Sequence, residues 1–480
     1  MTRVDRRTFV AGATVGAVWG LGCGPEPGEL APTRVVANPE PEPEDGAQAV
    51  SFDPEAVPRD DAAFPDGVLA GDMAATRARL WTRVADPSAG FTLRVWREAE
   101  AAGEVLLVVD TAVSPNSAGY LEVEVEGLGP SGYVYAFFDA ALSRRSPIGR
   151  FRTAFAEGDL RPLSLGLVAC TNYQRAPFPA LGLLAEERPD VVIHLGDLSY
   201  NDGATDLDTY RRLYRRTLQT ETYRALLGNA GIYPTWDDHE ITNNFDPETL
   251  EPARLALATQ AWFETLPVPE DAPLRLWRSH RWGATAEIFM LDCRSERKPS
   301  TLGSGAEEYI SEAQMSWLLE ALEQSPCHFK IIASSVPFTR LFGLWNLAKA
   351  DRWQGYEAQR ERLLAHLVDR VSGRVIFVAG DFHCGFVSRV EPEGPGTDIF
   401  EVTVSTAPAS INPVAALYET GDVEPENTFP PEQFPFGTGK PYCATTLVLD
   451  PLNDEAKVKF VDGSEANFGT VLYDALLPFA

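Results

Sequence analysis

The stretch "YPTWDDHEITNNF", residues 233–245, gathers three carboxylates, an imidazole and two amides between aromatic residues. They belong to Asp237, Asp238, His239, Glu240, Asn243 and Asn244. Oxygen and nitrogen donors of these types bind divalent and trivalent cations. A polar surface loop of unusual composition is the alternative interpretation, and the rest of the chain has to decide between the two.

Other apolar, strand-like runs also end in residues that bind metals. Cys170 ends "GLVAC", Asp197 ends "VVIHLGD" with Tyr200 three residues later, and Asp381 ends "VIFVAGD" with His383 two residues later. In an α/β sheet the carboxyl ends of the strands lie along one edge and hold the ligand. We therefore expect these side chains to meet the 233–245 block at one sheet edge.

The ligand types indicate the chemistry. Thiolate and phenolate ligands favour iron, and a carboxylate such as Asp197 can bridge two adjacent ions. Paired ions generate hydroxide from bound water and neutralise the charge that develops during phosphate ester cleavage. His239 and Arg294, which follows the run "AEIFMLD", are expected to hold phosphoryl oxygens or assist the leaving group. Asp238 is expected to take part in catalysis.

Each feature taken alone also has a purely structural explanation. A Gly-Asp pair after a strand is common turn chemistry, and a buried cysteine at a strand end usually packs as a small apolar residue. His194 lies inside a strand and is expected to be a core residue, while Asp237 is compatible with a solvent-facing position. The coincidence of four strand ends favours a site. The sequence has no Gly-x-Ser-x-Gly motif, which argues against serine hydrolase chemistry.

The elements that must position these residues fall into two regions. Residues 61–155 contain short, regularly spaced strands with turn residues between them, which predicts a small β-sandwich. Residues 160–480 alternate apolar strand-like runs with helical stretches, which predicts an α/β domain. No chemical constellation lies in the sandwich, so we expect it to be an accessory domain. The Pro/Glu-rich residues 24–60 are predicted to be a linker.

Composition limits the class of function. The 480 residues suffice for two domains, and 44% hydrophobic with 23% charged residues is ordinary for a globular protein. The net charge of -28 disfavours nucleic-acid and anionic-lipid partners. We therefore expect no nucleic-acid-binding role, and a phosphate site would need local positive charge such as metal ions.

The N-terminus is typical of a targeting segment. Arg6 and Arg7 precede an uncharged run of about 14 residues, which is too short to cross a bilayer comfortably. A twin arginine at this place is the address of the Tat export route; a chance pair is the alternative. Residues 1–23 are thus predicted to be a Tat-type signal that engages the Tat machinery, and the protein to be periplasmic, secreted or lipid-anchored.

Cys23 ends this run and leaves two forms open. A lipid-modified cysteine before a flexible tether would look like this, but Gly20 stands where the usual lipobox has leucine. Without Cys23, five of the six cysteines remain, an odd number for an oxidising compartment. One of the five is then expected to do something other than pair.

The blocks "GDLSY", "YPTWDDHEITNNF" and "VAGDFHCGF" resemble the PhoD-type alkaline phosphatases and phosphodiesterases, a branch of the calcineurin-like metallophosphoesterases. With further blocks they span residues 64–385 in the order of that family. The resemblance implies a β-sandwich followed by a four-layer α/β/β/α catalytic domain. It also implies a site that holds iron (Fe³⁺) together with calcium (Ca²⁺).

The resemblance also implies which residues bind each metal. Cys170, Asp197, Tyr200 and His383 match the iron ligands, and the thiolate–phenolate pair is expected to give visible colour. Asp197, Asp381 and one of Asn243 and Asn244 match the calcium side. The chain departs from the family in having Ala169 before Cys170, and Cys384 beside His383 where a small hydroxyl residue is usual. Cys384 is expected either to pair with another cysteine or to crowd the site.

The sequence thus predicts an exported, monomeric metal-dependent phosphoesterase that hydrolyses phosphate mono- or diesters, small or polymeric, by attack of metal-activated hydroxide. One alternative is a non-catalytic surface lipoprotein that keeps the fold as a binding module. Another is a phospholipase D-like phosphodiesterase. The segments "WNLAKADRWQGY" and "ENTFPPEQFPFGTGKPY" are hypothesised to form a wall or lid over the site.

Overall fold

The computed structural model describes residues 32–37, 53–98, 105–270, 274–423 and 428–479. The predicted signal segment 1–23 and Cys23 lie outside the described residues. The predicted linker 24–60 is described in part, and the described part corrects the prediction at one place. Strand β1 (Thr33–Val36) pairs in parallel with β6 (Tyr120–Glu126), so this part of the segment is an edge strand of a sheet.

The strands of the described residues form three sheets. The largest runs in the order β1, β6, β3 (Arg77–Arg83), β2 (Val68–Gly71), β11 (Gly231–Thr235), β10 (Val191–Leu195), β9 (Leu163–Val168), β19 (Cys443–Asp450), β20 (Glu455–Asp462) and β21 (Val471–Leu476). The second runs β12 (Arg278–Trp282), β13 (Ala286–Met290), β14 (Phe329–Ala333), β15 (Arg374–Ala379), β17 (Phe400–Thr403), β16 (Gly385–Arg389) and β18 (Phe436–Thr438). The third runs β5 (Val105–Val113), β4 (Phe91–Glu98), β7 (Gly132–Asp139) and β8 (Gly149–Arg152).

The predicted N-terminal β-sandwich is present. Its inner faces share one apolar core, to which β4 and β7 contribute Leu93, Val95 and Phe137 and β6 contributes Val123 and Val125. One of its two sheets continues into the α/β part, because β2 pairs with β11 in parallel at Gly71 and Ile232. The sandwich is therefore joined to the α/β part through a common sheet.

The α/β part contains two face-to-face sheets. Strands β9, β10 and β11 are parallel to one another, as are β13, β14, β15 and β17. Leu165 of the first sheet and Ile288, Ile331 and Ile376 of the second belong to the same buried cluster. Strands buried on both faces are expected to be almost continuously apolar, and "VVIHL" in β10 is fully buried.

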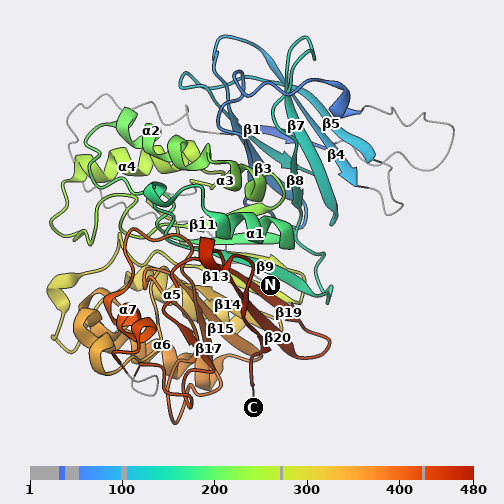
Figure 1. Cartoon of the computed structure of the whole chain (residues 1–480). Helices are drawn as coiled ribbons and strands as arrows, with labels where there is room; N and C mark the ends of the chain where they lie inside the picture. The colour runs from blue at the N-terminus through green and yellow to red at the C-terminus, as the bar shows by residue number, and fades with distance from the viewer. Residues whose placement is uncertain (1–31, 38–52, 99–104, 271–273, 424–427, 480) are drawn as a thin grey trace, which may run out of the picture. The chain divides into compact units, whose positions relative to one another are not determined.

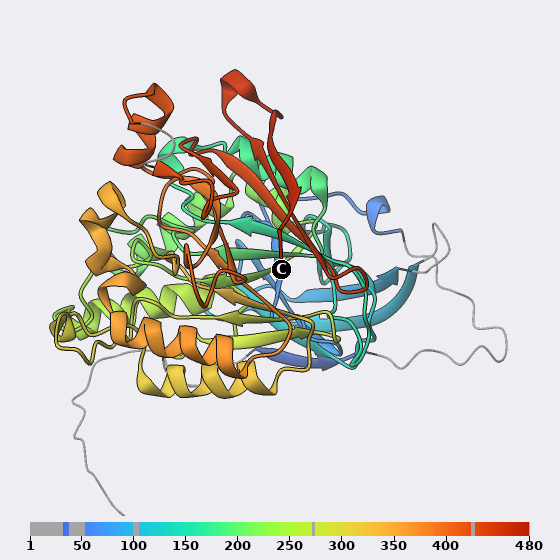
Figure 2. The same ribbon diagram turned by 90° about the horizontal axis from the view of Figure 1, so that it is seen from below.

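Helices cover the outer face of each sheet (Figure 1). The helices are α1 (Pro179–Glu187), α2 (Leu207–Leu218), α3 (Glu221–Leu227), α4 (Pro252–Thr265), α5 (Glu312–Gln324), α6 (Glu357–Arg370) and α7 (Pro413–Thr420). Helices α1 to α4 pack on the first sheet, where Tyr214 and Trp262 join the cluster of Val192. Helices α5 and α6, yellow and orange in Figure 2, pack side by side on the second sheet. The predicted four-layer α/β/β/α arrangement is confirmed.

Strained backbone concentrates where the strands end. Cys170, Asp197, Asp381 and His383 have φ values of 55°, 57°, 59° and 57°, in the left-handed region that non-glycine residues rarely adopt. Such conformations cost free energy, and they cluster at functional sites whose surroundings hold them in place. The loops at these strand ends are therefore constrained in a way that ordinary turns are not.

The glycines of the two Gly-Asp pairs allow close backbone approach. A Cβ atom on Gly196 would lie 2.5 Å from Cβ of Asp237, and one on Gly380 would lie 2.7 Å from Cβ of Ala169. Both distances are below van der Waals contact, so only glycine fits. These positions bring the loops after β9, β10, β11 and β15 within reach of one another.

Two further features of the described residues concern membrane spans and cysteine pairing. None of the helices described there is long and apolar enough to cross a membrane. Cys170, Cys293, Cys327, Cys384 and Cys443 are all buried free thiols, so the expected pairing of Cys384 is not present. Cys384 instead packs among Phe382, Phe386 and Phe429, and its pKa is raised by burial.

Candidate metal centre

The predicted ligands come from strand ends of two different sheets. Cys170 follows β9, Asp197 follows β10 and Asp238 follows β11, whereas Asp381 and His383 follow β15 of the second sheet. The expectation of one common sheet edge was wrong in this respect. The side chains still meet because the two sheets face each other and hydrogen bonds connect their loops. For example, the amide of Ala407, after β17, donates to the Cys170 carbonyl at 3.0 Å.

Three overlapping groups of donor atoms lie at this junction. Within each group the donor atoms lie within 4.8 Å of one another. The groups are Cys170, Asp197 and His383; Asp197, Asp238 and His239; and Asp237, Asp238 and Asp381. Asp197 and Asp238 each belong to two groups. This arrangement fits two adjacent cations that share a carboxylate.

Several buried oxygen atoms at this junction lack partners. Within the described part of the chain, Asp197 Oδ2, Asp238 Oδ1 and the Tyr200 hydroxyl are buried without a hydrogen-bond partner. Buried polar atoms are normally paired, and an exception calls for an explanation such as a bound ion. Two of these atoms, those of Asp197 and Tyr200, belong with the nearby Cys170 thiol to the donor set that the resemblance implies for iron.

The pKa shifts of the side chains at this junction favour the binding of cations. Removal from water and neighbouring carboxylates raise the pKa of Asp197 and of Asp381 well above the usual range. Burial, together with Asp197, likewise raises the pKa of the Cys170 thiol. Burial and the charge of His239 lower the pKa of His383 to about 4, which leaves the neutral imidazole that binds metals. Cations held here would offset the carboxylate repulsion.

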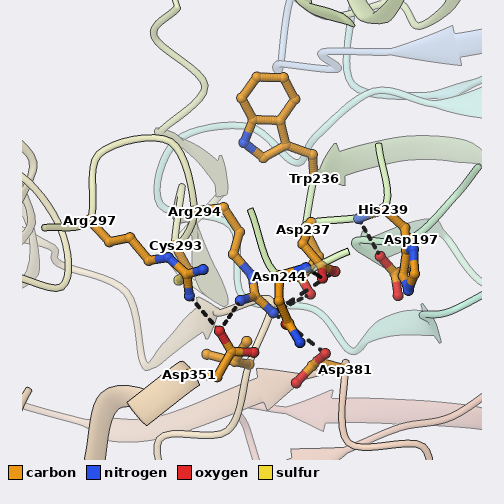
Figure 3. Close-up of polar contacts among 12 residues, drawn as sticks. Asp197, Trp236, Asp237, His239, Asn244, Cys293, Arg294, Arg297, Asp351 and Asp381 are labelled. Carbon is orange, nitrogen blue, oxygen red and sulfur yellow. Dashed lines mark hydrogen bonds and ion pairs between the residues drawn. The ribbon is translucent and has the colours of Figure 1, made fainter. Parts of the chain in front are cut away.

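His239 is oriented by a residue that the sequence did not single out. Its Nδ1 lies 2.8 Å from Asp202 Oδ1, and its ring packs against Tyr200 with a centroid distance of 4.0 Å. Burial lowers the pKa of His239, but Asp197 and Asp202 outweigh this effect and raise it to about 10. Figure 3 shows His239 directly beside Asp197. Asp202 lies just after the "GDLSY" block, and this position beside a predicted ligand motif could have identified it from the sequence.

Arg294 lies at the centre of a carboxylate cluster (Figure 3). Its fully buried guanidinium bonds both oxygens of Asp237, at 2.6 and 2.8 Å, and Asp351 Oδ1 at 2.6 Å. Asp381 Oδ1 lies 3.5 Å away. The alternative of a solvent-facing Asp237 was wrong, since this residue is 1% exposed. Arg294 is engaged by carboxylates, so its expected contact with phosphoryl oxygens stays a prediction.

The hypothesised wall segments contact this cluster. Asp351 ends η4 (Gly343–Asp351), and its Oδ1 accepts bonds from both Arg294 and Arg297. Trp345 of η4 donates to the Thr428 carbonyl at 2.8 Å and packs on Phe382, between Asp381 and His383, at 4.9 Å. The two segments therefore contact each other beside the predicted ligands, and their role as a wall or lid stays a hypothesis. Neither Asp351 nor Arg297 was anticipated from the sequence.

The two asparagines have different surroundings. Asn243 directs its backbone amide to Asp202 Oδ1 at 2.6 Å. The side-chain amide of Asn244 lies beside the carboxylates; with its NH₂ turned toward them it donates to Asp351 Oδ2 at 2.9 Å and Asp238 Oδ2 at 3.3 Å. With its oxygen turned the same way, it would join these carboxylates around a cation. Asn244 thus fits the metal side better than Asn243.

His194 is a core residue, as expected. It is fully buried in β10, and its Nε2 lies 2.9 Å from the Tyr223 hydroxyl. Burial lowers its pKa to about 3, so it stays neutral. It takes no part in the metal centre.

Glu240 joins the two loops that carry the shared carboxylates. Its side chain accepts hydrogen bonds from the backbone amides of Asp197 at 3.1 Å, Leu198 at 2.6 Å and Asp237 at 3.0 Å. It is fully buried, and burial raises its pKa to about 7. Glu240 therefore positions the ligand loops and does not itself bind metal.

Glu240→Gln is expected to weaken metal binding by about 10- to 100-fold, because its NH₂ would face a backbone amide and displace the ligand loops. Metal affinity measured by competition with a chelator tests this. Glu401→Gln is the matched control, since Glu401 is also buried and accepts from backbone amides, those of Phe338 and Thr339 at 2.6 and 3.2 Å. Equal metal affinity of the two variants would contradict the positioning role.

Comparisons with known proteins match two regions of the chain. The PhoD-like phosphatase family matches residues 165–416, and the N-terminal domain of PhoD-like phosphatases matches residues 48–155. This chain belongs to the PhoD-like phosphatase family. The first match covers the α/β part with its metal centre up to α7, and the second covers the β-sandwich.

Sequence identity to an individual relative is low. Alkaline phosphatase D of Bacillus subtilis (strain 168) is 26% identical over 386 residues, which are 68% of this chain and 65% of that protein. The chain thus spans less than two thirds of the length of this relative.

Two solved structures share the fold. The structure of PhoD superposes with a TM-score of 0.70 and 22% identity over 87% of this chain and 89% of that one. The purple acid phosphatase PPD1 from yellow lupin (Lupinus luteus) seeds superposes with a TM-score of 0.60 and 13% identity, over 85% of this chain and 72% of that one.

Proposed function

We propose that this protein is a metal-dependent phosphoric ester hydrolase that acts on phosphate monoesters, diesters or both. The observation that carries the proposal is the sharing of Asp197 and Asp238 between overlapping groups of metal-binding side chains. Two cations bound side by side supply water activation and charge neutralisation for an in-line displacement at phosphorus. Membership of the PhoD-like phosphatase family and the similarity to alkaline phosphatase D of Bacillus subtilis support the same reaction class.

The proposed metals are iron on one side and calcium on the other. Cys170, Asp197, Tyr200 and His383 would hold Fe³⁺, because thiolate and phenolate donors suit iron. Asp197, Asp381 and Asn244 would hold Ca²⁺ through oxygen atoms, with Asp238 beside them. The unpaired oxygens of Asp197, Asp238 and Tyr200 support this assignment.

The chain's own side chains have separate proposed tasks. His239, held by Asp202 at 2.8 Å, is proposed to donate a proton or hydrogen bond to the leaving-group oxygen. Arg294 holds Asp237 and Asp351 in place, and Glu240 holds the ligand loops. The segment around Trp345 is proposed to limit the open side of the site, since Trp345 packs on Phe382 beside Asp381 and His383.

Export through the Tat route is proposed on the twin arginine Arg6–Arg7 alone. The protein would then be periplasmic, secreted or, if Cys23 is acylated, a lipid-anchored lipoprotein, and a monomer. The retained set of ligand types favours catalysis over the non-catalytic binding module. A phospholipase D-like diesterase would use the same centre and differ in substrate alone.

The test is a measurement of metal content and visible absorption on protein exported through Tat, together with hydrolysis of p-nitrophenyl phosphate and bis(p-nitrophenyl) phosphate. We expect iron and calcium in equal amounts and a coloured band. Tyr200→Phe is expected to abolish or strongly shift that band, because it removes the phenolate. Tyr214→Phe, a buried tyrosine outside the site, is the control. A colourless protein that takes up no metal on reconstitution would refute the ligand assignment.

A further inference from the structure

A pocket of about 600 Å³ lies along the C-terminal half of α2. Its lining is strongly basic and includes Arg83, Tyr173, Arg212, Arg215, Arg216 and Gln219. The helix turns its apolar residues, such as Leu213 and Leu218, into the core, so its arginines lie on the other side. The chain has a net charge of -28. The four arginines therefore give this pocket a charge opposite in sign to that of the whole protein.

Among the described residues, three of these arginines have no ion-pair partner within 4.0 Å. On the same helix Arg211 is paired with Glu264 at 2.6 Å, but Arg212, Arg215 and Arg216 form no ion pair with any described residue. Nε of Arg215 and Nε of Arg216 are also buried without a hydrogen-bond partner there. Positive charge that the protein leaves uncompensated is available to an anionic ligand.

The neighbours of the arginines fix their positions. The Arg216 guanidinium lies 4.4 Å from the Tyr173 ring centroid, a cation–π contact that leaves its nitrogens free. Arg83 Nε is held by Asp66 at 2.6 Å, and the same carboxylate accepts from Gln219 at 2.7 Å. Asp66 therefore orients two lining residues. Two further acids lie near the N-terminal end of α2: Asp206, whose pKa is lowered mainly by hydrogen bonds to Thr209, and Asp208, which pairs with Arg211 at 3.5 Å.

The pocket lies close to the metal centre along the chain. Tyr173 follows Cys170 by three residues, so their Cα atoms are at most about 11 Å apart. Planar guanidinium groups match the oxygens of a phosphate group and bind it through paired hydrogen bonds. Several such groups around one pocket provide both the charge and the donors that a phosphate needs.

We propose that this arginine pocket binds a phosphate group other than the one held at the metal centre. One source is a second phosphate of an extended phosphate ester, an assignment that rests on the proposed function. The other source is free inorganic phosphate, which needs no catalysis. Either ligand would explain a basic pocket in an acidic protein.

The binding test uses the metal-loaded protein titrated with inorganic phosphate and with tripolyphosphate in a calorimeter. Arg212→Ala/Arg216→Ala is expected to lose one binding event or to weaken it by about tenfold or more, since each charged hydrogen bond contributes substantially. Arg362→Ala/Arg370→Ala removes two arginines from α6 and is the matched control. If both double variants bind phosphate like the wild type, the proposal is overturned.

Kinetics distinguish the two sources. The substrates are bis(p-nitrophenyl) phosphate, with one phosphate, and a synthetic propanediol phosphate oligomer, with several. A rise of about tenfold in KM for the oligomer alone in the α2 variant would assign the pocket to the substrate. Lost phosphate binding with both KM values unchanged would assign it to free phosphate. If the protein hydrolyses no ester, the proposed function fails, but lost phosphate binding in this variant would still establish the pocket.

Discussion

Asp197→Asn is expected to reduce hydrolysis of phosphate esters by at least about a thousandfold, because the proposed bridging carboxylate would be needed by both cations. The variant is also expected to lose most of its bound metal. Its Oδ2 is buried without a hydrogen-bond partner, and Asp197 is shared by two ligand groups. Metal analysis and the initial rate with p-nitrophenyl phosphate measure both effects.

The same substitution is expected to stabilise the metal-free protein. Burial, together with the neighbouring carboxylates, raises the pKa of Asp197, which means that its charge costs free energy in the folded state. Removing that charge should raise the urea midpoint of the chelator-treated protein, as is common at sites that exchange stability for function. Asp462→Asn is the control, because Asp462 is a buried carboxylate satisfied by Lys440 at 2.6 Å. An Asp197→Asn protein with normal iron and calcium would exclude the bridging role.

The second large effect is expected for Arg294→Gln, which should lower the free energy of unfolding by about 3–5 kcal/mol. The substitution leaves the carboxylates of Asp237 and Asp351 without their shared guanidinium, which bonds them at 2.6 Å. Breaking a buried ion pair from one side is costly because the remaining charge stays out of water. Urea unfolding of the chelator-treated protein measures the effect without contributions from metal binding.

Two further variants separate charge from packing at Arg294. Arg294→Gln/Asp237→Asn should recover part of the lost stability, since it removes the stranded charge as well as its partner. Arg360→Gln is the control for loss of a fully buried arginine, which pairs with Glu391 at 2.6 Å; it should destabilise the protein but leave metal content unchanged. No recovery in the double variant would show that Arg294 acts through packing alone.

Much of the fold was predictable because the signals are local. Alternating apolar residues in segments such as 91–98 and 132–139 predict strands, and both are strands of the β-sandwich. Continuous apolar runs such as "VVIHL" predict buried parallel strands, and β10 is one. The short strand at 33–36 was missed, because its Pro/Glu-rich surroundings are typical of a linker and its pairing with β6 is a long-range contact.

The candidate site was only partly accessible to sequence reasoning. Cys170, Asp197 and Asp381 could be identified because each directly follows an apolar run. The partners Asp202 and Asp351 carry no such local mark. Asp351 lies 57 residues from Arg294 in the sequence, so their contact depends on where folding places the C-terminal end of η4.

The sequence by itself determined the donor types, their positions at the ends of strands and the family to which the chain belongs, because these depend on residues close together in the chain. The tertiary structure decided which donors share a cation site, that Asp237 pairs with Arg294, and that Asn244 faces the carboxylates. It also placed Arg212, Arg215 and Arg216, which form no ion pair among the described residues, around one pocket on α2. The physical reason is that ion pairs and metal sites depend on distances of a few ångströms between segments that only folding brings together.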